Sequence, residues 1–156
     1  MRNASKIGAV CYVLWGVLHS YIGGMLLWKT IAGGTHDALA AVGNALPDSQ
    51  IPHVENAVTN GLVEHYAWNL IWFGVFAVVV AVWLNWRGSR VGYWCNLVVV
   101  SLTDLGFIAA IVVPGYITLV AGLPGPVLWL AAAVFTSLGR PAATRAASTS
   151  SALSPG

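Results

Sequence analysis

A few ionisable and amide side chains interrupt the long apolar runs of this chain, and they are of types that move protons. Glu64, His65 and Asn69 stand close together, whereas His19 and Asp104 lie in two other runs. Polar groups in apolar segments of this length cost free energy and often mark a site. A carboxyl group and an imidazole in different surroundings can act as acid and base at one pH. We expect Asp104 to be the acid and His19 or His65 to be the base. Glu64 is a further catalytic candidate.

The segments that carry these residues are too apolar for a soluble domain. Hydrophobic residues make up 58% of the chain and charged residues only 8%, whereas soluble domains carry about 25% charged residues. Four apolar runs reach the roughly 20 residues that a membrane-spanning helix needs. We therefore predict an all-α fold, an integral membrane four-helix bundle over residues 1–139. The expected spans are about 7–28, 62–86, 91–113 and 117–138, with a long outer loop over 29–61 and a disordered tail over 140–156.

The basic residues predict the orientation of the spans. Arg2 and Lys6 precede the first span, Arg87 and Arg90 separate the second from the third, and Arg140 and Arg145 follow the fourth, whereas Lys29 stands alone on the opposite side. Cytoplasmic loops carry an excess of lysine and arginine. We therefore expect a multi-pass protein of the cell membrane with both termini and the tail in the cytoplasm.

Depth along the helices brings the polar residues together. At about 1.5 Å per residue, His19 and Asp104 each lie about 20 Å from the cytoplasmic start of their helices. The second helix runs inward from outside, so Glu64 and His65 are about 5 Å deep and Asn69 about 10 Å. All five fall in the outer half of the bilayer, which predicts an outward-facing pocket inside the membrane.

Helical spacing adds a predicted substrate-binding surface of aromatic and polar residues. On the second helix, His65, Asn69 and Trp72 share one stripe, with Glu64 and Trp68 on the adjacent stripe. The predicted substrate-binding residues are Asn69, Trp15, Trp68, Trp72, Asn96, Thr103, Phe107 and Trp129. The leading hypothesis is an enzyme that performs acid/base chemistry, such as isomerisation or cyclisation, on a lipophilic small molecule.

Other interpretations of the same residues stay open. Glu64 and His65 are near enough to the membrane boundary to be ordinary interfacial residues, and Asp104 with His19 can form a purely structural pair. The chain can be a non-catalytic accessory subunit or a lipid-binding or transport protein. Haem or a metal on His19, Glu64, His65 and Asp104 is a further alternative, but the spacings that helical metal sites use are absent. We predict no cofactor.

The sequence also indicates which kinds of partner the protein has. No basic, aromatic-rich face points to nucleic acid. Membrane lipids are expected partners, and an oligomer is possible.

Two helix-like stretches in the outer loop, 35–46 and 52–60, are expected to form a lid over the bundle. The segment from Tyr116 to Gly125 is expected to be irregular or re-entrant, with Pro126 as a possible first helical residue. In span number and size the chain resembles small bacterial four-helix membrane proteins, including the DoxX-like group, and this resemblance reaches no individual motif residue.

Overall fold

The computed structural model of the protein is all helical and describes residues 2–42, 47 and 56–139. Within that part, four helices are long and apolar enough to cross a membrane: Asn3–Val42, Ala57–Asn85, Arg90–Val112 and Leu119–Leu138. This confirms the expected helical fold and its four candidate spans, and it indicates a membrane protein. The expected tail and most of the loop between 42 and 56 lie outside the described residues.

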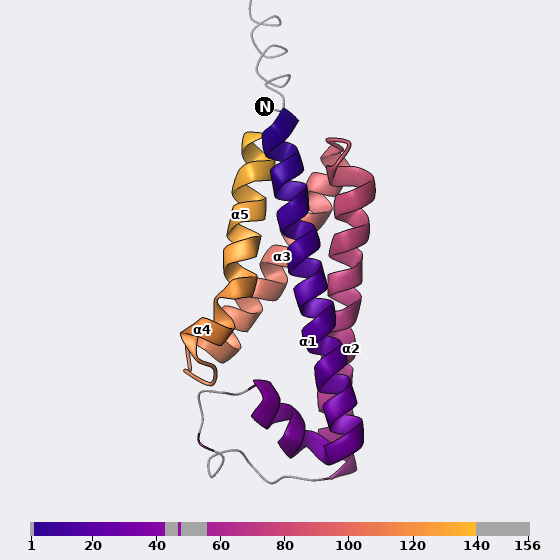
Figure 1. The fold of residues 1–156 in the computed structure, drawn as a ribbon, viewed down its shortest axis with the longest axis vertical. Coiled ribbons are helices and arrows are strands. Elements are labelled where there is room, and N and C mark those ends of the chain that lie inside the picture. Colours follow the sequence, from indigo (N-terminus) through magenta and orange to yellow (C-terminus); the bar gives the residue numbers. More distant parts are fainter. Residues whose placement is uncertain (1, 43–46, 48–55, 140–156) are drawn as a thin grey trace, which may run out of the picture.

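The first helix, α1 (Arg2–Val42), is longer than the predicted span and contains one sharp kink. Gly34 has φ 81° and ψ −179°, a conformation that glycine adopts without the steric cost of a side chain. Residues 35–42 form a short helical arm beyond this kink, which turns back beneath the bundle (Figure 1). Thr35 ties the arm to the second helix, because its hydroxyl donates to Asn60 Oδ1 at 2.6 Å. The predicted outer loop is therefore partly helical.

The second and third spans each end in a wider, π-helical turn. Helix α2 (Ala57–Val80) continues into η2 (Ala81–Asn85), and α3 (Arg90–Phe107) continues into η3 (Ile108–Val112). Asn56 caps α2 through a bond from Thr59 N at 2.9 Å. Ser89 caps α3 by accepting from Gly92 N. The caps and the tight turn between η2 and α3 place these two spans antiparallel.

The fourth span is broken near its start, as its prolines and glycines suggest. Gly115 has φ 78° in the turn that follows η3. The short helix α4 (Leu119–Gly122) is capped by Thr118, and α5 (Pro124–Leu138) begins with Pro124 in its first turn. Pro124, rather than the expected Pro126, therefore begins the main helix, because a first-turn proline lacks only a donor that would be unpaired anyway.

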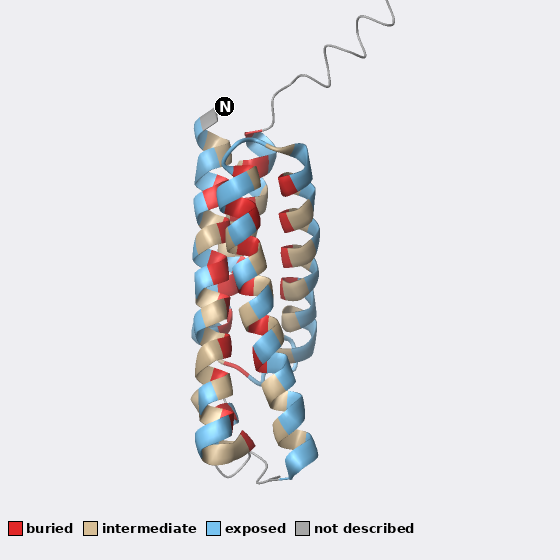
Figure 2. Cartoon of the chain, turned by 90° about the vertical axis from the view of Figure 1, so that its right-hand side faces the viewer, coloured by how far each residue is buried: buried red, intermediate tan, exposed pale blue. Residues whose placement is uncertain are grey.

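Helix α1 organises the bundle by packing between α2 and α5. Figure 1 shows α5 and α2 on either side of α1, with α3 tilted behind them and only sparsely in contact with α2. Figure 2 shows buried residues on the facing sides of the helices and exposed residues outside. The outer surface is rich in large apolar side chains, and only 17% of the Arg90–Val112 window is buried. Such a surface suits lipid rather than water.

Small residues let α1 and α2 approach closely. A Cβ added at Gly16 would collide with the Gly74 carbonyl oxygen, and one added at Gly74 would collide with Gly16 and Ser20. A Cβ added at Gly23 would likewise collide with the Ala67 carbonyl oxygen, whereas nothing lies within 4 Å of a Cβ added at Gly24. A small-residue interface of this type is common between membrane helices.

Charged and aromatic residues mark both ends of the α1 span. Lys6 Nζ lies 5.5 Å from the centroid of Trp86, and Lys29 Nζ lies 5.4 Å from the centroid of Trp28. At about 1.5 Å per residue, the two lysines are separated by about 35 Å along the helix. That separation suits a hydrocarbon core about 30 Å thick with lysine and tryptophan at its boundaries.

Gly16→Ala should destabilise the bundle, and Gly24→Ala on the same helix should not. The added methyl at Gly16 forces α1 away from α2, for which we expect a loss of about 1–3 kcal/mol. The methyl at Gly24 meets open space, so stability should stay unchanged or rise by up to about 1 kcal/mol through helix propensity. Reversible unfolding of both variants in detergent measures the difference. Equal effects of the two substitutions would contradict the described α1–α2 interface.

Candidate functional site

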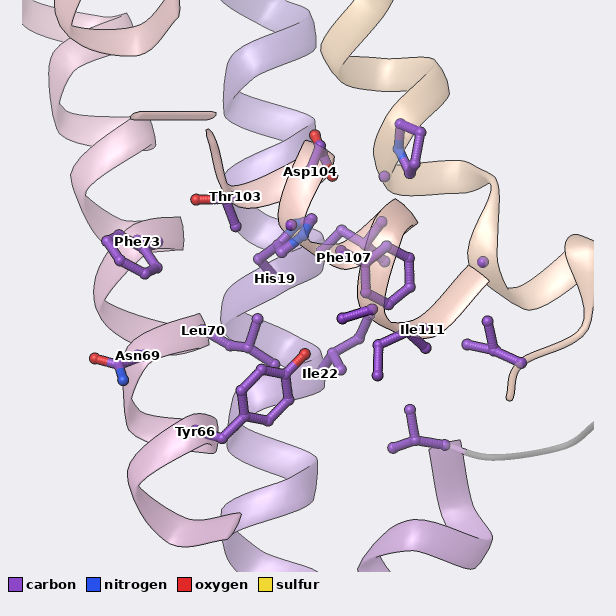
Figure 3. Close-up of a pocket in the computed structure, with 18 of the residues that line it drawn as sticks. His19, Ile22, Tyr66, Asn69, Leu70, Phe73, Thr103, Asp104, Phe107 and Ile111 are labelled. Atoms are coloured by element: carbon purple, nitrogen blue, oxygen red, sulfur yellow. The ribbon is translucent and has the colours of Figure 1, made fainter. Parts of the chain in front are cut away.

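A cavity of about 580 Å³ lies between α1, α2, α3 and the α4–α5 segment. Its walls are mostly aliphatic and aromatic, with a few polar residues (Figure 3). A volume of this size suits a small organic ligand. Val42 at the end of the helical arm also lines the cavity. The arm therefore contributes to one end of the cavity, and His19 and Asp104 lie towards the other end.

Trp15, Asp104 and His19 form a buried, connected group. The Trp15 indole Nε1 donates to Asp104 Oδ2 at 2.7 Å, although the two residues are 89 positions apart. The His19 ring stacks on the Trp15 ring, with centroids 3.7 Å apart and planes inclined by 22°. Trp15 and Asp104 are fully buried, and His19 is 8% exposed. Trp15 is therefore the positioning residue that holds the two titratable groups.

The hydrogen bond of His19 determines which ring nitrogen is free. His19 Nδ1 lies 2.9 Å from the Trp15 carbonyl oxygen. A carbonyl oxygen only accepts, so Nδ1 must carry the hydrogen of this bond. In the neutral imidazole, Nε2 then holds a lone pair. His19 can thus act as a base through Nε2, with its other nitrogen fixed by the backbone of its own helix.

Asp104 and His19 meet beside a glycine of α5. Asp104 Oδ1 is buried and has no hydrogen-bond partner within the described part of the chain. A Cβ built on Gly125 would lie 3.5 Å from Asp104 Oδ1 and 3.7 Å from His19 Nε2. The same Cβ would lie only 3.1 Å from His19 Cε1, so the absence of a side chain at Gly125 lets the carboxyl group and the imidazole pack against α5. The acid and the base are thereby held close together at this end of the cavity.

Four further residues of the predicted site and its surroundings line the cavity. Phe107 lies beside His19, and the Tyr66 hydroxyl points inward (Figure 3). The Asn69 amide turns away and contacts His65 Nε2 at 3.1 Å. The Thr103 hydroxyl donates to the Val99 carbonyl oxygen at 2.9 Å. Of these residues, Tyr66 presents the only hydroxyl that forms no hydrogen bond within the described structure, so it is a further polar group that a ligand can use.

The predicted site residues fall into two groups. His19, Asp104, Asn69, Thr103 and Phe107 line the cavity, and Trp15 supports it. The other predicted residues lie away from the cavity: Glu64, His65, Trp68, Trp72, Asn96 and Trp129. Of these six, Glu64 and His65 were predicted from depth and the other four from helical spacing. Glu64 is half-buried near the start of α2.

The predicted residues that do not line the cavity lie elsewhere in the structure. His65, Trp68 and Trp72 are exposed on the outer face of α2, where Trp72 contacts Phe76. Asn96 is buried elsewhere in the bundle and donates to the Ala77 carbonyl oxygen at 3.3 Å.

Trp129 makes a helix-to-helix bond instead of lining the cavity. Its indole Nε1 donates to Ser101 Oγ at 2.8 Å, which links α5 to α3.

Sequence reasoning missed Gly125 and Tyr66. Gly125 gave a signal, because it stands in the interrupted segment Leu123-Pro124-Gly125-Pro126, but its place beside His19 depends on how α5 packs. Tyr66 follows Glu64 and His65 directly. Each residue along a helix is rotated by about 100° from the one before, so the Tyr66 side chain points in a different direction from theirs. Its orientation was therefore not evident from depth alone.

The described residues offer no assembled metal site. Among residues 2–42, 47 and 56–139, no three histidine, cysteine or carboxylate side chains come together. His65, the other histidine of the haem hypothesis, lies on the outer face of α2 and does not share the cavity with His19. The free Nε2 of His19 therefore faces a cavity whose other titratable side chains, among the described residues, are Asp104 and Tyr66.

Comparisons of the chain with protein families, with curated proteins and with solved structures found no match. The geometry and chemistry of the cavity are therefore the basis on which a function can be assigned.

Trp15→Phe should destabilise the protein because it removes the only hydrogen-bond donor to Asp104 in the described structure. A buried carboxyl group left without its partner costs about 1–3 kcal/mol. The same loss should be smaller in an Asp104→Leu background, where no polar partner remains. A double-mutant cycle of unfolding free energies in detergent measures this coupling. Strictly additive effects of the two substitutions would show that the bond contributes nothing.

Proposed function

We propose that this protein is a small membrane enzyme that performs acid/base chemistry on a lipophilic small molecule. The supporting observation is that Asp104 Oδ1 and His19 Nε2 converge beside Gly125 in an otherwise apolar cavity. General acid/base catalysis needs an acid and a base within reach of one substrate. Isomerisation and cyclisation are the reaction types that need only these two groups.

In an isomerisation, the two groups would exchange protons with the substrate. The carboxyl group of Asp104 would deliver its proton to a carbonyl oxygen or an alkene carbon. His19 Nε2 would remove a proton from a neighbouring carbon, so one C–H bond breaks as one new O–H or C–H bond forms. The imidazolium would then return a proton to the carboxylate. The cycle is balanced and consumes no other reactant.

Trp15 would keep both groups in position during this cycle. Its indole N–H bond to Oδ2 leaves Oδ1 facing the substrate, and its carbonyl oxygen fixes the tautomer of His19. Orientation of this kind is a large part of catalysis because it avoids ordering the groups during the reaction.

A non-catalytic membrane accessory subunit or lipid-binding protein is the second candidate. The observation that favours it is the same set of contacts with Trp15, since a stacked histidine and a bonded carboxyl group also stabilise helix packing. In that case the cavity would hold a lipid without converting it. The two candidates differ in whether protons are transferred to a bound molecule.

Hydrogen–deuterium exchange into the bound molecule tests catalysis without knowledge of the product. Lipophilic molecules that co-purify with the protein are identified by mass spectrometry and incubated with the purified protein in D₂O. The native protein should incorporate deuterium at carbon, and Asp104→Asn should lower the rate by about 10²-fold or more.

The thermal unfolding temperature of Asp104→Asn serves as the folding control, because the amide keeps the shape of the carboxyl group. An unchanged exchange rate in a folded Asp104→Asn protein would rule out Asp104 as the acid. Loss of folding together with unaltered exchange per folded molecule would favour the structural role.

The proposed location is the cell membrane, with both ends of the chain in the cytoplasm and the cavity closer to the outer face. The basic residues at 2, 6, 87, 90, 140 and 145 support this orientation, with Lys29 alone on the other side. The start of α1 and the start of α2 lie at opposite ends of the bundle (Figure 1). Asn3 and Gly61 are near these starts and are both exposed.

A cysteine at position 61 should therefore react with a membrane-impermeant maleimide on intact cells, and a cysteine at position 3 should not. Asn3→Cys and Gly61→Cys are made in a background in which Cys11 and Cys95 are replaced by serine. Labelling of Asn3→Cys should require lysis of the cells. The reverse labelling pattern would invert the orientation.

A further inference from the structure

Near Asp104, few polar atoms of the described cavity lining are without a hydrogen-bond partner, and these few are complementary. Thr103 is bonded to its own helix and Asn69 turns to His65. His19 Nε2 and Asp104 Oδ1 remain beside Gly125. Among the described residues, a ligand head group at this end of the cavity therefore has these two atoms to satisfy, and the Tyr66 hydroxyl lies further along the cavity.

The charge of the cavity restricts what that head group can be. None of the described residues that line it is a lysine or an arginine. A carboxylate or phosphate ligand would meet Asp104 with no cation to balance it. Asp104 itself has no cationic partner there, and a buried, unpaired charge costs more than the neutral form. The neutral carboxyl group donates through Oδ1, because Oδ2 already accepts the indole hydrogen.

This arrangement places one donor and one acceptor close together at one end of the cavity. Both Oδ1 and Nε2 lie within 4 Å of the position that a Cβ on Gly125 would occupy. A hydroxyl group has one hydrogen to donate and lone pairs to accept. Its oxygen can accept from Asp104 and donate to His19 at the same time. An ether has no hydrogen to donate, and an ammonium group has no lone pair to accept.

The rest of the cavity suits an apolar body that arrives from the membrane. Beyond His19 the walls are Ile22, Leu26, Leu70 and Ile111, with Phe107 beside them. Leu102 and Gly106 of α3 line the cavity and are also exposed on the outer surface. Since α3 touches α2 only sparsely, this side of the cavity faces the bilayer between the two helices.

We infer that the ligand of this cavity is a neutral lipophilic alcohol, phenol or enol that enters sideways from the bilayer between α2 and α3. Its hydroxyl group binds between Asp104 Oδ1 and His19 Nε2, and its apolar body lies along α1 and α3. This inference names the substrate class of the proposed enzyme and so rests on the proposed function.

A matched set of probes tests the head group on the unaltered full-length chain. The probes are 4-octylphenol, its methyl ether 4-octylanisole, 4-octylbenzylamine and 4-octylbenzoic acid, which share one apolar body. Binding to the detergent-purified protein is measured by native mass spectrometry. The phenol should bind at least tenfold more tightly than the ether, which has lost the hydrogen that His19 accepts. Tighter binding of the amine or the acid, or equal binding of all four probes, would overturn the inference.

Two substitutions locate the preference at the site. Asp104→Asn should retain it, because the amide keeps a donor towards the ligand and an acceptor for Trp15. His19→Phe should abolish the preference for phenol over ether while the binding of the ether stays. Tyr93→Phe, near the start of α3 and outside the cavity lining, is the matched control and should change neither. A preference that survives in His19→Phe would place the hydroxyl elsewhere.

Failure of the inference is distinguishable from failure of the proposed function. Deuterium exchange that depends on Asp104, together with a preference for the amine, would keep the enzyme and reject the ligand class. A preference for the phenol without any exchange would keep the ligand class and make the protein a binding protein.

Discussion

The bond between Trp15 and Asp104 is the contact on which the rest of the site depends. A carboxyl group inside a membrane-spanning helix costs free energy unless it has a hydrogen-bonding or charged partner. Trp15 provides that partner from another helix, and the same residue also orients His19 through its ring and its carbonyl oxygen. One side chain thus fixes the positions of the acid and the base, so its loss should disturb both.

The helix packing explains why a cavity exists next to this contact. Helices α1 and α2 approach closely through Gly16, Gly74 and Gly23, and α5 packs on the other side of α1. Helix α3 is held mainly at the η2 end and leans away from α2 elsewhere (Figure 1). Close packing of α1 against α2 and α5, combined with sparse packing of α3 against α2, leaves the space beside His19 unfilled. Gly125 adds to this space because it has no side chain.

Much of this arrangement could be predicted from the sequence, but not the faces of α2. Length and hydropathy predicted four helices, and depth alone matched His19 with Asp104. The polar stripe of α2 was expected to face inward. In lipid, small residues that allow close approach decide which face is buried, and on α2 these are Ala67, Gly74 and Ala77. His65 lies about 200° around the helix from Ala67, so it points outward. The position of Gly125 depends on tertiary packing, which no local pattern reports.

The arrangement requires that His19 offers a free Nε2 to the cavity beside Asp104. Solid-state ¹⁵N NMR of histidine-labelled protein in lipid bilayers measures this directly, with His19→Gln to assign the signal among the four histidines. We expect a neutral ring with hydrogen on Nδ1 and a lone pair on Nε2, and we expect the Nε2 shift to change when 4-octylphenol binds. Hydrogen on Nε2 with a bare Nδ1, or a signal that is unchanged by the phenol, would show that His19 is not the base facing the cavity.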